Sequence, residues 1–215
     1  MIVGMYMTRD VEVISPETSL LDAIHRMSRR RIRRLVVTDK DAIVGIVCHR
    51  DLVEAFPHHI NPFSPVAAGT EAASDKVNSV MIHPVITIPD DKPLEQAAKL
   101  MTDRHIGALP VTSGGRLVGI ITESDIFRAL TEVLTQRDDS VRITFDLTER
   151  EDVLSFLAEM TRKYGLTLLS FISFHEGDRR MAVAAVRGKQ VEDLVRELWS
   201  SGHRVVSVLR SSDGS

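Results

Sequence analysis

The residues best suited to chemistry are a threonine and an aspartate three positions apart, Thr122 and Asp125, in the run Thr-Glu-Ser-Asp. A carboxylate accepts hydrogen bonds from the vicinal hydroxyls of a ribose, and a helix start with a threonine hydroxyl suits a phosphate. The same spacing suits a local role, in which Thr122 caps a helix and Asp125 completes a capping box. Both roles can hold together at one helix start.

The segment that carries this pair occurs twice, because residues 7–56 align without a gap on residues 81–130. Most identities are apolar, as a duplicated core requires, but a glycine and an aspartate are also shared. In the first copy Cys48, a poor capping residue, replaces Thr122, whereas the aspartate is kept as Asp51. A purely local cap would not need that aspartate, so its presence favours ligand binding.

Each copy predicts the same elements: a short strand, an amphipathic helix, two strands joined by a turn, and a second helix. Copies of about 50 residues are too small to bury a good core alone, so the two should pack against each other. The predicted repeats span residues 1–57 and 77–135. The connector 58–76 is rich in Pro, Ala, Ser and Gly and is interpreted as a surface linker.

Residues 140–210 predict a third folded part with the order β-α-β-β-α-β. Its second and third strands form a hairpin, and its last strand completes a four-stranded sheet in a ferredoxin-like plan. The predicted strands and helical stripes are 141–145, 153–160, 166–174, 181–186, 191–198 and 205–209. The whole chain is therefore expected to belong to the α+β class.

The pattern Leu-Pro-Val, a turn and Leu-Val-Gly-Ile-Ile-Thr-Glu-Ser-Asp at residues 109–125, repeated more weakly at 35–51, resembles a tandem pair of cystathionine-β-synthase (CBS) domains, a Bateman module. A ferredoxin-like part behind such a pair is similar to an ACT domain, and the order is similar to AcuB-type acetoin-utilisation proteins. No residue points to acetoin. The turn 146–150 lacks the Pro-Gly pair usual in amino-acid-binding ACT domains. This absence favours a dimer contact through the sheet of this domain over amino-acid binding.

The resemblance implies an adenosine-containing ligand, either AMP, ADP, ATP or S-adenosylmethionine, in the cleft between the repeats. Strand ends would supply the apolar walls, although each wall residue taken singly also suits a core. The residues implied for the second site are Ile82, His83, Val85, Ile106, Ala108, Pro110, Thr122 and Asp125. Those implied for a weaker first site are Thr8, Arg9, Val11, Ile32, Arg34, Val36 and Asp51. The phosphate candidates are Arg30, Arg31, Arg104 and His105.

The run of arginines at residues 29–34 has three interpretations: charge at a helix end, contacts to nucleotide phosphates, or a nucleic-acid patch. The chain has 27 Lys and Arg against 30 Asp and Glu, a net charge of -3. This balance argues against nucleic-acid binding through global charge, while a local patch stays possible.

Signals for catalysis and metal binding are weak. Cys48, His49 and Asp51 are sequence neighbours, which rarely form a catalytic triad, and His58 and His59 lack a third ligand. One cysteine forms no internal disulfide. No apolar run approaches the roughly 20 residues of a membrane span, and the first ten residues lack a secretory signal, so a cytoplasmic location is expected.

The sequence therefore predicts a non-enzymatic sensor that requires no cofactor or metal and takes an adenine nucleotide or S-adenosylmethionine as its regulatory ligand. By resemblance it forms a homodimer, and a regulated partner protein is possible. Two alternatives stay open: a ligand-free interaction or oligomerisation module, and a nucleic-acid-binding regulator that uses the cluster Arg29–Arg34.

Overall fold

A computed structural model describes residues 1–56, 61–64, 67, 69–134, 140–149 and 152–210. The chain divides into two compact units, unit 1 at Met1–Ala129 and unit 2 at Leu130–Ser215. Both units mix helices and strands, as the sequence predicts. His58 and His59 lie outside the described residues. No described helix has the length and apolar character that a membrane crossing requires.

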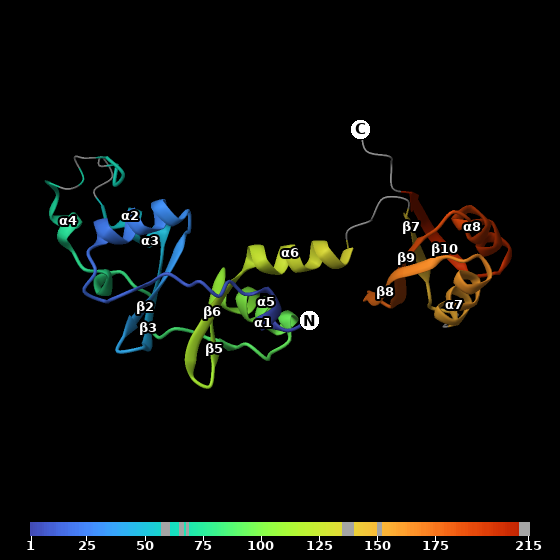
Figure 1. Cartoon of the computed structure of the whole chain (residues 1–215), viewed down its shortest axis with the longest axis horizontal. Helices are drawn as coiled ribbons and strands as arrows, with labels where there is room; N and C mark the ends of the chain where they lie inside the picture. The colour runs from blue at the N-terminus through green and yellow to red at the C-terminus, as the bar shows by residue number, and fades with distance from the viewer. Residues whose placement is uncertain (57–60, 65–66, 68, 135–139, 150–151, 211–215) are drawn as a thin grey trace. The chain divides into compact units, whose positions relative to one another are not determined.

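Unit 1 holds two copies of one arrangement, each with a three-stranded sheet and helices (Figure 1). In each sheet the first two strands are parallel and the last two antiparallel. The first copy comprises β1 (Val13–Ile14), α2 (Leu20–Arg30), β2 (Arg34–Asp39), β3 (Ala42–Cys48) and α3 (His49–Glu54). The second comprises β4 (Ile88–Pro89), α5 (Leu94–Arg104), β5 (Ala108–Ser113), β6 (Arg116–Thr122) and α6 (Glu123–Leu134). The predicted helices and strands of both repeats are confirmed.

Helix α2 begins and ends where its local chemistry dictates. The Ser19 hydroxyl oxygen accepts the Asp22 backbone N–H at 3.2 Å, which satisfies one of the free donors of the first turn. The helix ends at Arg31, whose φ of 54° is left-handed, and α5 ends in the same way at His105 with φ 53°. This shared end turns the chain into β2 and β5, so it positions residues 32–34 and 106–108.

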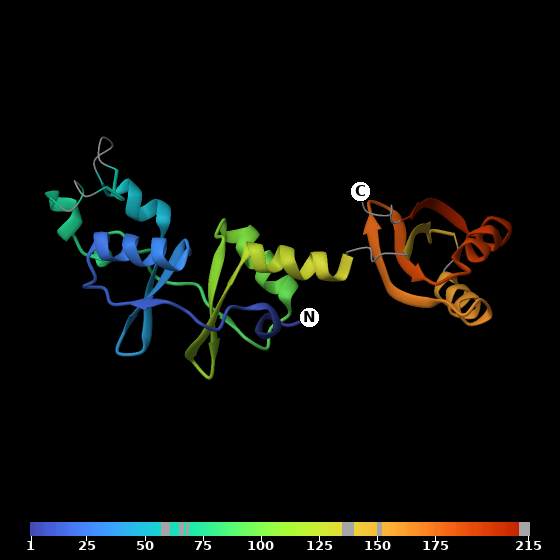
Figure 2. The same cartoon turned by 45° about the horizontal axis from the view of Figure 1, so that its top comes forward.

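The opening segment of each repeat crosses to the other repeat. Helix α1 (Val3–Tyr6) lies beside α5 (Figures 1 and 2), and Val3 and Met7 are buried in the core of the second repeat. Thr8 then pairs with Ile120 through two backbone hydrogen bonds of 2.9 Å. Residues Ile46 and Ile82 form the matching bridge on the other side, at 2.8 and 3.2 Å. The two repeats therefore exchange their first segments.

Two glycines make this exchange possible. A Cβ on Gly119 would lie 2.5 Å from the Met7 sulfur and 3.0 Å from the Thr8 carbonyl oxygen. A Cβ on Gly45 would likewise collide with the side chain of Met81. The crossing backbone and its methionine thus lie directly on each glycine, which explains why both copies carry a glycine there.

The connector between the repeats differs from the expected surface linker in its described part. Ala67 is fully buried and Ala73, in α4 (Glu71–Ser74), is 6% exposed. Both belong to the core of the first repeat, together with Val77 at the start of a 3-10 turn, Val77–Ser79. Small apolar side chains in this segment therefore pack against the core, which its Pro, Ala, Ser and Gly content did not reveal.

Unit 2 has the predicted order β-α-β-β-α-β. Its elements are β7 (Ser140–Asp146), α7 (Val153–Lys163), β8 (Thr167–Glu176), β9 (Arg179–Arg187), α8 (Val191–Ser200) and β10 (Arg204–Arg210). The strands lie in the order β10-β7-β9-β8, and all neighbours are antiparallel. Both helices pack on one face of this sheet (Figure 2), around a core centred on Phe145, Leu157 and Leu194. The turn after β7 is fixed by Asp146, whose carboxylate accepts the Thr148 N–H at 3.0 Å.

Candidate functional site

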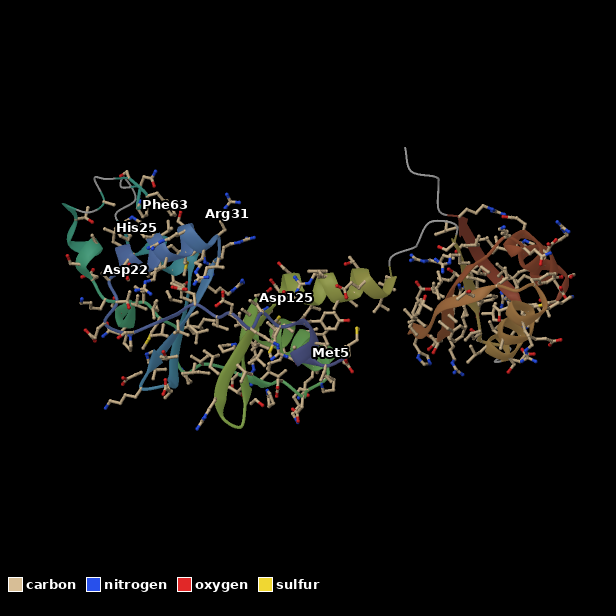
Figure 3. The ribbon with its side chains drawn as sticks, viewed as in Figure 1. Met5, Asp22, His25, Arg31, Phe63 and Asp125 are labelled. Carbon is tan, nitrogen blue, oxygen red and sulfur yellow. The ribbon has the colours of Figure 1, made fainter. Side chains whose placement is uncertain are left out.

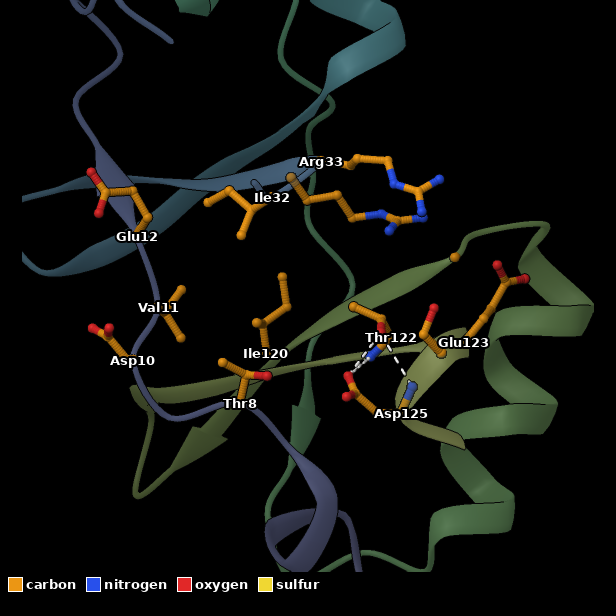
Figure 4. A pocket seen from close by; sticks show the side chains of 13 residues that line it. Thr8, Asp10, Val11, Glu12, Ile32, Arg33, Ile120, Thr122, Glu123 and Asp125 are labelled. Carbon is orange, nitrogen blue, oxygen red and sulfur yellow. Dashed lines mark hydrogen bonds between the residues drawn. The ribbon is translucent and has the colours of Figure 1, made fainter. Parts of the chain in front are cut away.

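The site containing Thr122 and Asp125 is a cavity of about 290 Å³ between the two repeats of unit 1, here called cavity 1 (Figure 4). This volume reaches the lower end of the ~300–1,000 Å³ typical of ligand pockets. One wall comes from the crossing segment and the entry of β2, and the other from β6 and the start of α6. The lining residues are Thr8, Asp10, Val11, Glu12, Ile32, Arg33, Arg34, Gly107, Ile120, Thr122, Glu123, Ser124 and Asp125.

Asp125 is held by local hydrogen bonds at the start of α6 (Figures 3 and 4). Its Oδ2 accepts the Thr122 backbone N–H at 2.8 Å and the Thr122 hydroxyl at 2.7 Å, and its Oδ1 accepts Arg128 at 2.8 Å. The capping interpretation therefore holds. A carboxylate offers about four acceptor positions, so one position on Oδ1 is left for a ligand hydroxyl. Contact with both ribose hydroxyls would require the Thr122 hydroxyl to turn away.

Two arginines supply positive charge to cavity 1. Arg33 is exposed and Arg34 half-buried, and neither guanidinium has a hydrogen bond or ion pair within the described part of the chain. In Figure 4 the Arg33 side chain extends from the residue just before β2 toward the side where Thr122 and Glu123 lie. A planar guanidinium binds phosphate through paired hydrogen bonds, so these groups suit an anion on the α6 side of the cavity.

A second cavity of about 210 Å³, cavity 2, lies at the equivalent place on the other side of unit 1. Asp51 faces it, and its Oδ2 accepts the Cys48 backbone N–H at 2.8 Å. Burial, followed by the hydrogen bond with Asp51, raises the pKa of the Cys48 thiol, which keeps it protonated. The lining residues are Arg34, Ile46, Cys48, Arg50, Asp51, Ile82, Pro84, Val85, Ile86, His105, Ile106, Gly107, Ala108 and Pro110.

The two cavities group the expected residues differently from the sequence analysis. Thr122 and Asp125 face residues of the first repeat, whereas Asp51 faces residues of the second. The exchange of opening segments is the reason, because it brings each such segment to the last strand of the other repeat. From the expected second site, Ile82, Val85, Ile106, Ala108 and Pro110 line cavity 2; from the first, Thr8, Val11, Ile32 and Arg34 line cavity 1. His83, Arg9 and Val36 line neither, and Val36 is fully buried.

The inference drawn from Asp51 was wrong. This aspartate accepts the N–H of Cys48 exactly as Asp125 accepts that of Thr122, so it has a local capping function without any threonine. The backbone N–H at the helix start needs an acceptor whichever side chain the first residue carries. The retention of Asp51 therefore gives no independent support for a ligand.

The phosphate candidates also lie differently from expectation. Arg30 forms ion pairs with Asp10 at 3.2 Å and Glu12 at 3.3 Å, and Arg31 ends α2 on the outside of the repeat (Figure 3). Arg104 is exposed and lines neither cavity, while His105 lines cavity 2. The arginine run is thus divided between helix-end ion pairs and cavity walls.

The sequence analysis missed several lining residues, among them Arg33 in cavity 1, Arg50 in cavity 2 and Gly107, which lines both. Arg33 could have been found from the sequence, because it belongs to the arginine run 29–34 for which phosphate contacts were one interpretation. Nothing in the sequence pointed to Gly107 or Arg50, because their places in the walls depend on how the two repeats face each other.

Unit 2 contains a hydrogen-bonded series of a serine, a histidine and an aspartate. His203 Nδ1 lies 2.7 Å from the Ser201 hydroxyl, and Nε2 lies 3.3 Å from Asp152. The same hydroxyl lies 2.7 Å from the carbonyl of Leu198 in the last turn of α8. These contacts link the C-terminal end of α8 to the N-terminal end of α7. Over the residues that the structure describes, no group of three His, Cys, Asp or Glu side chains is arranged to hold a metal ion.

Unit 1 is similar to known proteins in sequence and in structure. The CBS domain model matches residues 3–58 and 77–132. A CBS domain-containing protein of Dictyostelium discoideum is 34% identical over 135 residues, 62% of this chain and 93% of that protein. The structure of a protein assigned to acetoin utilization (AcuB) from Vibrio cholerae is 30% identical with a TM-score of 0.52, covering 62% of this chain and 93% of that one. The structure of CBSX2 in complex with AMP is 28% identical with a TM-score of 0.51, covering 61% and 97%.

Proposed function

Because the chain belongs to the CBS-domain family, we propose that unit 1 is a regulatory module that binds an adenosine-containing ligand in cavity 1. The observation that carries this proposal is that one cavity brings together an apolar wall, a helix start and two arginines without a hydrogen bond or ion pair to any described residue. A relative 28% identical to this chain has been solved with AMP, which supports the same ligand class here.

The lining of cavity 1 matches the parts of such a ligand. Val11, Ile32 and Ile120 offer apolar contacts for an adenine ring. The remaining acceptor position on Asp125 suits one ribose hydroxyl, and Arg33 suits a phosphate or carboxylate. Glu123 adds a negative charge at the same end, which favours ligands with few phosphates or with a cationic group.

We propose further that unit 2 is an ACT-type domain that passes the state of unit 1 to a second copy of the chain or to a partner protein. Its strand order β10-β7-β9-β8, with both helices on one face, supports this assignment. Phe174 and Val206 are 43% and 55% exposed on this sheet, which suits contact with another chain. The protein would then act without catalysing a reaction.

Calorimetric titration of AMP, ADP, ATP and S-adenosylmethionine into the full chain tests the proposal. At least one ligand should bind saturably, and Arg33→Ala and Asp125→Ala should each weaken a phosphate-bearing ligand about tenfold, within the range for a lost charge-assisted hydrogen bond. Arg29→Ala is the matched control, because Arg29 belongs to the same run and lines neither cavity. Since the Arg33 guanidinium has no hydrogen bond or ion pair among the residues that the structure describes, its loss should leave the melting temperature unchanged.

A ligand-free interaction module is the second candidate. It is favoured by the three hydrogen bonds that Asp125 already accepts, which give this side chain a complete structural function. Absence of binding by all four ligands would support this candidate. Binding that neither Arg33→Ala nor Asp125→Ala affects would instead overturn the assignment of the ligand to cavity 1.

A further inference from the structure

Cavity 1 and cavity 2 share two lining residues, Arg34 and Gly107. Arg34 is the first residue of β2 and pairs there with Cys48, which lines cavity 2. Its guanidinium reaches over Gly107, so that Nη2 would clash with a Cβ on this glycine. The charged end of Arg34 therefore lies in the wall common to both cavities.

The duplication does not supply a second arginine of this kind. The shift of 74 residues that relates the repeats places Gly107 opposite Arg33 and Ala108 opposite Arg34. One guanidinium thus stands where a symmetric pair of repeats would have two or none. Each cavity has additional basic groups of its own, Arg33 in cavity 1 and Arg50 with His105 in cavity 2, although Arg50 is paired with Glu54 at 3.7 Å.

We propose that Arg34 couples the two cavities negatively for phosphate-bearing ligands, an inference that rests on the proposed function. Its side chain carries a single positive charge that is never lost near neutral pH. A phosphate bound in one cavity, with a charge of about -1.5 to -2, attracts this guanidinium and neutralises it. A second phosphate then meets no free charge in the shared wall and is repelled by the first.

Glu123 increases this effect. A Cβ on Gly107 would lie 2.8 Å from its Oε2, so this carboxylate also lies over the shared wall. It faces cavity 1 and adds a negative charge where only Arg33 and Arg34 oppose it. The other carboxylates that line cavity 1 are already paired, Asp10 and Glu12 with Arg30 and Asp125 with Arg128. A bound anion in cavity 2 would therefore leave Arg33 against Glu123 in cavity 1. A neutral nucleoside has no phosphate to compete for Arg34, so it should fill both cavities independently.

The test is calorimetric titration of AMP and of adenosine into the full chain, for the wild type, Arg34→Gln and Arg33→Gln. In the wild type the second AMP should bind more weakly than the first. The difference should exceed the statistical factor for two equal, independent sites by about tenfold, within the range of site-to-site coupling. Adenosine should show no such separation. Arg34→Gln should weaken the first AMP and abolish the separation, whereas Arg33→Gln, which changes only cavity 1, should keep it.

A second variant guards against an unforeseen effect of Arg34→Gln on folding. Gly107→Ala places a methyl group where the guanidinium lies and meets only the ends of two flexible side chains, so it should displace Arg34 and act in the same way. An AMP stoichiometry and separation that both variants leave unchanged would overturn the coupling while leaving the proposed function intact. No binding of AMP or adenosine would overturn both.

Discussion

Replacement of Gly119 by alanine tests the exchange of opening segments on which both cavities depend. The added methyl would lie 2.5 Å from the Met7 sulfur, 2.9 Å from its Cγ and 3.0 Å from the Thr8 carbonyl oxygen. The methionine end can move, but the carbonyl is held by a hydrogen bond of 2.9 Å from Ile120. Overpacking of a filled core costs about 1–3 kcal/mol, and a strained backbone hydrogen bond adds to it. We expect Gly119→Ala to lower the free energy of unfolding of unit 1 by about 2 kcal/mol.

Two further alanine variants calibrate this value. At Gly45 every close atom belongs to the flexible side chain of Met81, so Gly45→Ala should cost less, about 1 kcal/mol. A Cβ on Gly69 would have no atom of the described residues within 4 Å, and the φ of Gly69 is not positive, so Gly69→Ala should change stability by less than about 0.5 kcal/mol.

Hydrogen exchange measured by mass spectrometry across a urea series resolves the two units in one experiment. Peptides from β6 should lose protection at lower urea in Gly119→Ala, while peptides from β9 in unit 2 should behave as in the wild type. Equal stability of Gly119→Ala and Gly69→Ala would refute the close crossing of Met7 over β6. A loss of protection in β9 as large as that in β6 would show that the effect is not confined to unit 1.

Two other predictions concern single helix ends. Cys48→Thr gives α3 the hydroxyl cap that α6 has, so it should stabilise unit 1 by about 0.5–1 kcal/mol in urea unfolding, and destabilisation would contradict the capping geometry. In unit 2, hydrogen bonds from Lys163 at 2.8 Å and from the Tyr164 hydroxyl lower the pKa of Glu197 in the folded state. The contribution of Glu197 to the free energy of unfolding is therefore complete above the pKa of about 4.3 that the residue has in the unfolded chain. This contribution is lost as the pH falls through the lower pKa that Glu197 has in the folded state. An acid titration followed by Trp199 fluorescence should show this loss in the wild type, and a profile for Glu197→Gln that matches the wild type would contradict it.

The sequence predicts the elements well because each one leaves a local trace. Apolar residues at helical spacing marked α2 and α5, and short apolar runs on either side of the turns 39–41 and 113–116 marked the strand pairs. The capping function of Asp125 could also be predicted, since it depends only on residues three positions apart. The same reasoning applied to Cys48 would have predicted the function of Asp51, because the acceptor serves a backbone N–H.

The grouping of the cavity walls could not be predicted in this way. Two similar repeats offer each opening segment two equivalent strands, its own and that of the other repeat, and hydrophobic pattern fits both equally. The choice depends on chain length and on the shape of the joint core. One trace was present: both copies carry a methionine and a glycine, and in the exchanged arrangement Met7 lies on Gly119 and Met81 on Gly45. Without the fold, these identities looked like ordinary core positions.

The aligned positions of the two repeats fall into two groups. Identical positions serve the scaffold, and certain positions that differ line the cavities. The paired glycines and aspartates are identical because the crossing and the helix starts need them, so they report on the scaffold. Two positions that differ in charge, Arg33 against Gly107 and Arg34 against Ala108, lie in the cavity walls. A duplicated scaffold alone would give two equal sites. The unequal charges make the two cavities different, and Arg34, which lines both, is the group through which we propose that an anion in either cavity is felt in the other.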